Sequence, residues 1–590
     1  MHNTPLAALR AELDRLGLQG FLVPRADEHL GEYTAPAAQR LAFLSGFTGS
    51  AGLAVVLKDR AAIFTDGRYA LQVRAQTDPA LWERHHVIEE PPPAWVAANA
   101  PPGARIGYDP MLVAEEGLQR YLDAGVTMVA VAPNPIDALW TDRPPPPLAP
   151  AVPHPVAYAG RESADKRAEL AATLREAGQD AAILTDPASI AWLLNIRGSD
   201  VPFTPFALGF AILGAEGGVE LFMAPEKLPP GTRAWLGNAV SVQDRSALPA
   251  ALARLNGKRV RVDPAGSPVW FAQTLREAGA NVVAEPDPCL LPKACKNPVE
   301  QQGTRAAHRR DAVAVARFLR WVEGAAGHAT ELQAATRLAG LRAEAVEYRG
   351  ESFSAISGAG EHGAVIHYRV SQETDRPIRP NELYLIDSGG QYPDGTTDIT
   401  RTVWTGPDAP PAELRDHATR VLKGHIAIAT LVFPQGLAGP HLDALARVAL
   451  WRAGLDYDHG TGHGVGSYLA VHEGPVSLSR TARPVPIAPG IILSNEPGFY
   501  LPGRYGIRVE NLVLVQPADL PAAIRPFLRF ETLSLAPIDR RLVEPKLLTE
   551  EELAWLNAYH ARVEAEVGPA LDAPTRAWLA SACAPIIPTG

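Results

Sequence analysis

Five side chains in the second half of the sequence are of the types that bind metal ions. They are four carboxylates and one imidazole, at Asp387, Asp398, His463, Glu496 and Glu510. Four carboxylates that converge in a protein interior would repel one another unless cations neutralised them. Because one divalent ion needs fewer acidic ligands, the set predicts two divalent cations that share bridging carboxylates. The usual chemistry of such a pair is the activation of a water molecule.

The spacing of the carboxylates predicts two hairpins that bring them together. The midpoint of Asp387 and Asp398 falls inside the turn letters YPDG, and the midpoint of Glu496 and Glu510 is Gly503, inside LPGR. Each hairpin should place its two carboxylates nearly opposite each other on one face. Taken singly, the two glutamates would be ordinary surface charges, but the long apolar runs beside them argue against exposure.

The imidazole and the ligand oxygens indicate the kind of ion. Oxygen-rich ligation favours hard or borderline ions such as Mn²⁺ over a thiolate-type zinc site. His463 lies in the glycine-rich stretch HGTGHGVG at 459–466, where glycines permit close approach of the backbone. The stretch is not a phosphate loop, because no Gly-Lys-Ser/Thr sequence follows it.

Two more histidines lie in apolar stretches, His367 and His472. Each of them, taken alone, is typical of a hydrogen-bonded core histidine. Beside a dinuclear metal centre, either could donate a hydrogen bond to a developing oxyanion or carry a proton.

Composition and charge describe a folded protein of several domains. The chain has 590 residues, with 46% hydrophobic and 20% charged residues and a net charge of −10, which predicts about three or four domains. The absence of a basic run predicts no nucleic-acid partner. The three cysteines (Cys289, Cys295 and Cys583) are too few for a disulfide scaffold and are interpreted as ordinary thiols of a reducing compartment.

The first residues predict a charged amphipathic helix at 5–17 rather than a signal peptide, because acidic and basic residues interrupt its leucines. No apolar stretch approaches the ~20 residues that a membrane span needs. These features predict a cytoplasmic protein without a membrane segment.

Two proline-rich segments, at 144–150 and 286–298, predict linkers. They divide the chain into domains at 1–150, 151–295 and 296–590. The first two domains share an order of helix and strand patterns, which predicts two related α/β domains. The third begins with a long amphipathic helix and mixes helices with hairpins, which is typical of an α+β fold. Its C-terminal end carries a capping-box pattern that predicts one more packed helix.

Short motifs surround the candidate ligands and recur in the other domains. In the third domain they are DSGG at 387–390, DGTTDITRT at 394–402, HGTGHGVG at 459–466, NEPG at 495–498 and RVEN at 508–511. Outside these they are SGFTGSAG at 45–52, TDGRY at 65–69, NIRGSD at 195–200, LLT at 547–549 and WLN at 555–557. Together they resemble the pita-bread metallopeptidases, most closely the three-domain, cytosolic-type Xaa-Pro aminopeptidase (aminopeptidase P) family.

The resemblance implies two creatinase-like N-terminal domains followed by a pita-bread catalytic domain. It implies a dinuclear Mn²⁺ enzyme that removes an N-terminal residue when proline is second, through a metal-bridging hydroxide. Carried over, Asp387 and Asp398 bind one metal, Asp398 and Glu510 bridge, and His463 and Glu496 complete the other metal.

The resemblance also implies roles around the substrate. The implied catalytic set is His367, His463, His472 and Glu496. The implied substrate contacts are His367, His472 and His459, with Arg68 from the first domain. The C-terminal helix could help to form the homodimer that similar enzymes adopt. One departure is the sequence EHG at 361–363, where relatives usually have Asn-Gly.

Two other functions compete with this one. A non-catalytic binding protein on the same scaffold would usually have lost metal ligands, whereas all five remain here. An enzyme for dipeptides or for N-terminal methionine is disfavoured because the shorter relatives lack the doubled N-terminal module.

Overall fold

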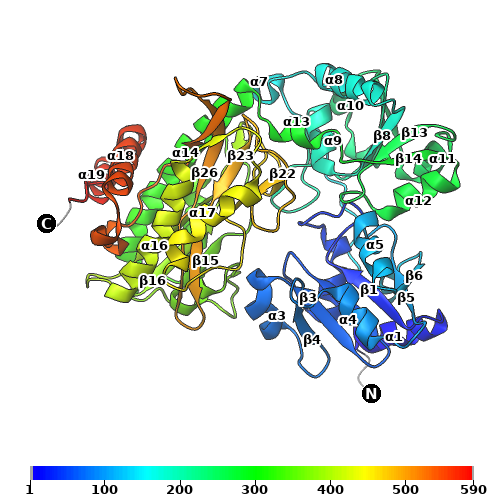
Figure 1. The fold of residues 1–590 in the computed structure, drawn as a ribbon, viewed down its shortest axis with the longest axis horizontal. Helices are drawn as coiled ribbons and strands as arrows, with labels where there is room; N and C mark the ends of the chain where they lie inside the picture. Colours follow the sequence, from blue (N-terminus) through cyan, green and yellow to red (C-terminus); the bar gives the residue numbers. More distant parts are fainter. Residues whose placement is uncertain (1–3, 588–590) are drawn as a thin grey trace. The chain divides into compact units, whose positions relative to one another are not determined.

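The computed structural model describes residues 4–587, which form two compact units that divide between Leu290 and Leu291 (Figure 1). Within the described residues, no helix combines the length and the apolar character needed to cross a bilayer. None of the three cysteines forms a disulfide.

The first unit contains two six-stranded sheets with the same topology. The first sheet has the order β4-β3-β2-β1-β5-β6 and the second β12-β11-β10-β8-β13-β14. In both sheets the central strand pairs antiparallel on one side and parallel on the other, and the outer pairs are parallel. The second sheet therefore repeats the first strand for strand, which agrees with the prediction of two related α/β domains.

The bounds of the strands and helices in the first unit follow chain order. The strands are β1 (Gly20–Pro24), β2 (Leu53–Leu57), β3 (Ala61–Thr65), β4 (Glu83–His86), β5 (Arg105–Tyr108), β6 (Thr127–Ala130), β7 (Val152–Pro153), β8 (Ala181–Leu184), β9 (Ile196–Arg197), β10 (Phe210–Gly214), β11 (Val219–Phe222), β12 (Val240–Gln243), β13 (Arg259–Val262) and β14 (Asn281–Ala284). The helices are α1 (Pro5–Arg15), α2 (Arg40–Ser45), α3 (Ala70–Gln76), α4 (Pro92–Asn99), α5 (Glu115–Asp123), α6 (Pro135–Leu139), α7 (Val156–Ala159), α8 (Ser163–Glu176), α9 (Pro187–Leu194), α10 (Pro230–Leu236), α11 (Leu248–Ala253) and α12 (Val269–Glu277).

Burial of both faces of β1 explains why helices cover both faces of the first sheet. In β1, Phe21 and Val23 belong to one hydrophobic core, and Leu22 between them belongs to another. A strand that is apolar on both faces must be covered on both. The proline-rich segment 144–150 then has neither helix nor strand, as its composition predicts. The segment 286–298 contains a short helix, α13 (Leu290–Ala294), which the sequence did not predict.

The second unit is an α+β fold, as predicted. Its helices are α14 (Pro298–Ala325), α15 (Glu331–Arg342), α16 (Ala412–Ala429), α17 (Gly439–Trp451), α18 (Glu550–Val567) and α19 (Ala573–Ala582). Its strands are β15 (Ile356–Ala359), β16 (Leu383–Ser388), β17 (Gln391–Tyr392), β18 (Gly395–Thr396), β19 (Ile399–Trp404), β20 (Val432–Pro434), β21 (Gly462–Gly464), β22 (Glu473–Leu478), β23 (Ile492–Asn495), β24 (Gly498–Leu501), β25 (Tyr505–Arg508), β26 (Asn511–Ala518) and β27 (Phe527–Thr532).

Two sheets of this unit carry the site. One has the order β15-β16-β19 and the other β20-β27-β26-β23-β21-β22. The long predicted helix is α14, which Asn297 and Glu300 begin with a capping box. The C-terminal helices α18 and α19, drawn in red in Figure 1, pack against α14, and Thr549 and Glu552 form the predicted capping box of α18. That tail is thus part of the core of the unit.

Candidate metal centre

The five candidate ligands stand at or beside the ends of short strands. Asp387 lies near the end of β16, Asp398 directly precedes β19, His463 is the middle residue of β21, Glu496 directly follows β23, and Glu510 separates β25 from β26. All four carboxylates and the imidazole are buried or half-buried.

The first hairpin places the two aspartates on one face as diagonal neighbours. In the ladder between β16 and β19, Asp387 pairs with Thr400, so Asp398 lies two residues further along the partner strand. The near-opposite placement that the sequence predicted is therefore displaced by two residues. Gly389 permits this geometry, because a side chain there would collide with the carbonyl oxygen of Thr397.

The second hairpin places the two glutamates opposite each other, as predicted. Asn495 pairs with Asn511 and, further along, Gly498 pairs with Arg508 in the same register. Between these two ladders the register puts Glu496 opposite Glu510. Neither glutamate N–H bonds across its own hairpin at this point.

The main chains of the two glutamates instead join the hairpin to its neighbours. The N–H of Glu510 donates to the carbonyl of Thr400 over 3.2 Å, which connects it to the strand of the first hairpin. The N–H of Glu496 donates to the carbonyl of Thr461 over 2.8 Å, which connects it to the glycine-rich segment of His463. These two bonds explain how residues from three parts of the sequence converge.

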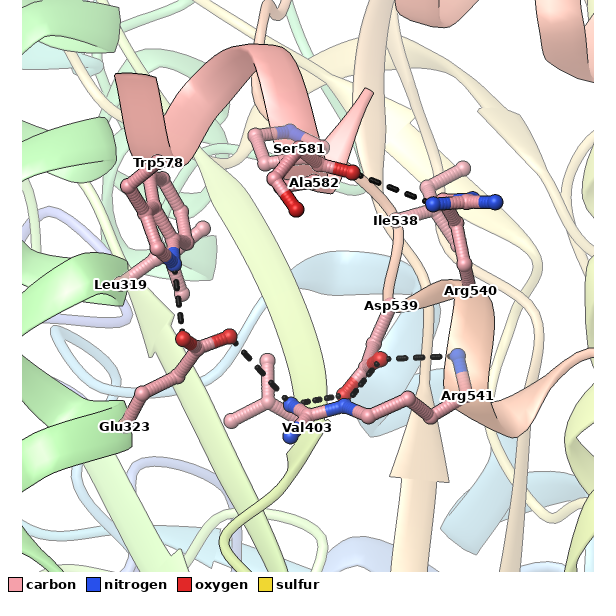
Figure 2. Close-up of a pocket in the computed structure, with 11 residues that line it drawn as sticks. Leu319, Glu323, Val403, Ile538, Asp539, Arg540, Arg541, Trp578, Ser581 and Ala582 are labelled. Carbon is pink, nitrogen blue, oxygen red and sulfur yellow. Dashed lines mark hydrogen bonds and ion pairs between the residues drawn. The ribbon is translucent and has the colours of Figure 1, made fainter. Parts of the chain in front are cut away.

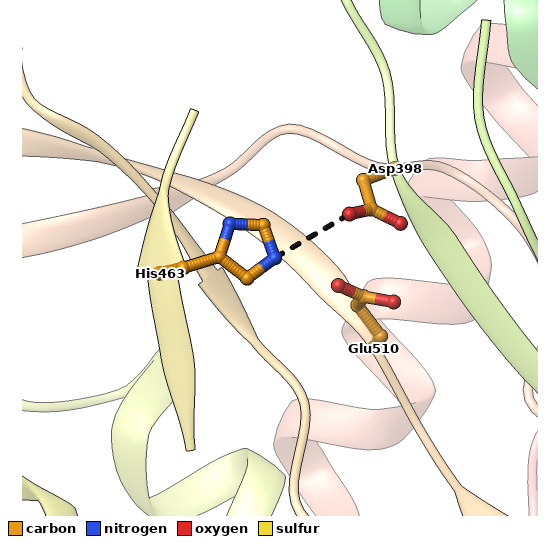
Figure 3. Close-up of side chains that lie close together, drawn as sticks. All are labelled: Asp398, His463 and Glu510. Carbon is orange, nitrogen blue, oxygen red and sulfur yellow. Dashed lines mark ion pairs between the residues drawn. The ribbon is translucent and has the colours of Figure 1, made fainter. Parts of the chain in front are cut away.

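His463 faces the carboxylates with its Nε2 atom (Figure 3). This atom lies 3.5 Å from Asp398 Oδ2 and 3.5 Å from Glu496 Oε1. Its Nδ1 atom lies 2.9 Å from the carbonyl oxygen of Gly464, to which it donates. That bond leaves the Nε2 lone pair directed at the carboxylates, an arrangement that suits a ligand of a shared cation. Asp398, His463 and Glu510 each offer a ligand atom, and these atoms all lie within 4.8 Å of one another.

The carboxylates carry more negative charge than the surrounding protein groups satisfy. Asp387 Oδ1, Asp398 Oδ1 and Glu510 Oε1 are buried and have no hydrogen-bond partner among the described residues. Burial, and then the neighbouring carboxylates, raise the pKa values of Asp398 and Glu510 well above the usual range. Burial also raises the pKa of Glu496. Unsatisfied hard oxygen atoms in a repulsive cluster fit divalent cations as partners.

The structure adds Arg508 and Tyr500, which the sequence analysis did not single out. Arg508 Nη2 lies 2.6 Å from Asp387 Oδ2, and its Nη1 donates to the Tyr500 hydroxyl over 2.6 Å. Burial raises the pKa of Tyr500 to about 12. Arg508 stands two residues before Glu510 in the motif RVEN. Because residues two apart in a strand share a face, the sequence could have predicted that Arg508 lies beside the carboxylates.

Two of the remaining predicted histidines join this cluster. The ring of His472 packs edge-on against His463, with ring centroids 4.2 Å apart. His459 Nε2 lies 2.9 Å from the Tyr500 hydroxyl and is connected through it to Arg508.

The third histidine and the arginine have roles that stay predictions. His367 is half-buried and follows the turn Gly360–Ala364, which packs against β25. Arg68 belongs to the first unit, where its guanidinium binds both carboxylate oxygens of Asp66 at 2.9 and 2.8 Å.

The sequence EHG at 361–363, which departs from the family pattern, places His362 against a buried carboxylate. His362 Nδ1 lies 2.9 Å from Oε2 of Glu331, a fully buried carboxylate that also accepts from the Tyr368 hydroxyl over 3.0 Å. His362 therefore ties the segment around His367 to helix α15.

A pocket elsewhere in this unit shares none of these residues. It has a volume of about 200 Å³ and lies between α14, β19 and α19 (Figure 2). Its two acidic side chains are paired with Arg541, which lies 2.8 Å from Asp539 and 3.5 Å from Glu323. The cluster of Asp398, His463 and Glu510, with its unpartnered carboxylate oxygens, is the candidate site.

Sequence comparisons agree with this geometry. Models of the creatinase/prolidase N-terminal domain match residues 5–138 and 142–300, the metallopeptidase family M24 model matches 302–517, and the C-terminal region of peptidase M24 matches 526–586. A probable Xaa-Pro aminopeptidase P of Aspergillus fumigatus is 39% identical, over 98% of this chain and 92% of its own length. The chain belongs to the Xaa-Pro aminopeptidase P family of M24 metallopeptidases. Aminopeptidase P1 of Lotus japonicus is 36% identical, over 99% of this chain and its full length.

Solved structures extend the comparison. An X-prolyl aminopeptidase from Caenorhabditis elegans, described as a cytosolic enzyme with a di-nuclear active site, superposes with a TM-score of 0.94 at 35% identity over 99% of both chains. A Xaa-Pro dipeptidase from Bacillus anthracis, with a TM-score of 0.52 at 20% identity, covers 64% of this chain and shares the fold alone. The predicted family, the creatinase-like and pita-bread fold and the class of metallo-aminopeptidase are confirmed.

Proposed function

We propose that the protein removes the N-terminal residue from peptides whose second residue is proline. The observation that carries this proposal is the convergence of four carboxylates and one imidazole with unsatisfied oxygen atoms, in a chain of the aminopeptidase P family. The doubled N-terminal module supports this substrate class over dipeptides, since relatives named as aminopeptidases P match the chain over 98% and 99% of its length.

The five ligands divide between two divalent ions in this proposal. Asp387 and Asp398 would hold one ion, His463 and Glu496 would hold the other, and Asp398 and Glu510 would be shared between them. Two such ions would lower the pKa of a shared water molecule and so supply a hydroxide nucleophile at neutral pH. Mn²⁺ suits a set with one nitrogen ligand and carboxylate oxygens.

The surrounding side chains would orient and bind the substrate. His472 packs against His463. In this proposal the ring N–H groups of His472 and His367 donate hydrogen bonds to the scissile carbonyl oxygen as charge develops on it. Arg508 holds Asp387 in place, so the carboxylate keeps one orientation. His459 and Arg68 are proposed substrate contacts. We also propose a cytoplasmic homodimer; the Caenorhabditis elegans relative is described as cytosolic.

The decisive experiment compares Arg-Pro-Pro with Arg-Ala-Ala. Metal-stripped protein is incubated with each tripeptide, with and without Mn²⁺, and released arginine is quantified. We expect Mn²⁺-dependent release from Arg-Pro-Pro alone. Cleavage of both peptides would indicate a broader aminopeptidase, and cleavage of neither by metal-loaded protein would indicate a binding protein.

Substitution of His367 tests its proposed role. If His367 stabilises the developing oxyanion, His367→Ala should lower kcat by about 10²-fold with little change in KM. Steady-state kinetics on Arg-Pro-Pro measure both constants. The exposed His328 in the same unit offers a matched control, and His328→Ala should leave both unchanged. A rise in KM alone would show that His367 contributes uniform binding instead.

A further inference from the structure

A buried ion cluster lies directly beside His472. The carboxylate of Glu473 is held by two lysines: Oε2 lies 3.0 Å from Lys293 Nζ, and Oε1 accepts from Lys296 Nζ. The three side chains are between 1% and 3% exposed. We propose that Lys293 and Lys296, through Glu473, are positioning residues that hold His472 against His463. This inference rests on the proposed function, because it concerns a histidine of that site.

The energetics of burial argue for a geometric role of the cluster. Removing three charges from water is costly, and well-packed apolar side chains of the same volume would often be as stable. A buried ion cluster is therefore weak evidence for stability. It does impose one geometry, because each carboxylate oxygen has its own directed ammonium donor.

The two lysines stand on a firmly held segment. Lys293 belongs to α13, and Lys296 belongs to the short connection between α13 and α14. The N–H of Lys296 donates to the carbonyl of Gly490 over 3.0 Å, and Gln301 Nε2 donates to the Lys296 carbonyl over 2.7 Å. The segment with Lys293 and Lys296, at the start of the second unit, is thus held by both backbone hydrogen bonds and side-chain ion pairs.

Strand β22 connects Glu473 to the segment of the candidate ligand His463. It begins at Glu473, which pairs with Gly464, the residue after His463. The two chains approach so closely that a side chain at Gly464 would collide with the carbonyl oxygen of Glu473. His472 directly precedes Glu473, and its ring lies 4.2 Å from that of His463. A displaced Glu473 would therefore shift His472 relative to His463.

A double-mutant cycle between Glu473 and His472 separates positioning from a general loss of stability. We expect Glu473→Gln to lower kcat on Arg-Pro-Pro by about tenfold or more, while two metal ions per chain are still bound. In the His472→Ala background, the same change should lower kcat less than about twofold, because the residue through which it acts is gone. Independent, multiplicative effects of the two substitutions would overturn the proposal.

The chain offers a matched control in the first unit. Lys227 and Asp200 form another buried ion pair, with side chains 3% and 0% exposed. Asp200→Asn should lower the melting temperature and leave kcat unchanged. If it lowers kcat as much as Glu473→Gln does, the effect is general destabilisation and the proposal fails.

A second variant and a structural readout keep the test decisive. Should Glu473→Gln not fold, Lys296→Met should show the same dependence on His472, and Lys296→Arg should restore most of the activity. Crystal structures of the wild type and Glu473→Gln should show a changed separation of the His463 and His472 rings; an unchanged separation would contradict the proposal. Failure of the proposed function is distinguishable, since the wild type itself would then not cleave Arg-Pro-Pro.

Discussion

Replacement of Glu510 by glutamine is expected to lower kcat/KM on Arg-Pro-Pro by at least about 10³-fold, or about 4 kcal/mol of transition-state stabilisation. Glu510 has a buried Oε1 atom without a partner among the described residues, and its Oε2 accepts from the Thr400 hydroxyl over 2.7 Å. An amide cannot supply the second anionic oxygen that a bridge between two cations requires. Bound metal should fall below two ions per chain, which elemental analysis of the dialysed protein measures.

Glu531 supplies the control for this substitution. It lies on β27, which pairs with β26, and binds Arg305 through two contacts of 2.7 Å. Glu531→Gln should keep both its metal content and its turnover. If Glu510→Gln retained turnover, the assignment of the metal ligands would be wrong.

The metal-free protein is expected to lose stability as the pH rises above the ordinary carboxyl pKa of about 4. The pKa values of Asp398 and Glu510 are raised by burial and by the neighbouring carboxylates. A folded-state pKa above the unfolded value of about 4 stabilises the fold at low pH, and that contribution disappears as the pH rises through the folded-state value. We therefore expect the melting temperature of the metal-free protein to fall as the pH rises through this range.

Calorimetry of the chelated and the Mn²⁺-loaded protein across this pH range measures the effect. Metal-loaded protein should keep its melting temperature, because cations offset the repulsion. Metal-free Glu510→Gln should melt higher at pH 8 than the metal-free wild type, although it is inactive. A melting temperature of the chelated protein that does not vary with pH would show that the four carboxylates do not repel one another in the folded state.

Elements whose signal is local in sequence could be predicted. The register of Glu496 and Glu510 follows from one turn, because a hairpin is symmetric about its own midpoint. Each of the helices α14 and α18 begins at a capping box made by two residues that stand three positions apart in the sequence. The doubled α/β module follows from the repeated order of elements, and the identical strand order of the two sheets agrees with it. The aspartate pair was displaced from prediction by two residues, because the turn is centred between Pro393 and Asp394, one residue past the midpoint of the pair.

The sequence by itself determined the types of the candidate ligands, the hairpins that pair them and the family. Only the tertiary structure decided how they meet. Glu510 reaches Thr400 through one backbone bond, and Arg508 holds Asp387 from 121 residues away. Lys293 binds Glu473 across 180 residues. Such contacts depend on how separate strands and helices pack, and no local periodicity or turn chemistry encodes which distant partner a buried charge finds.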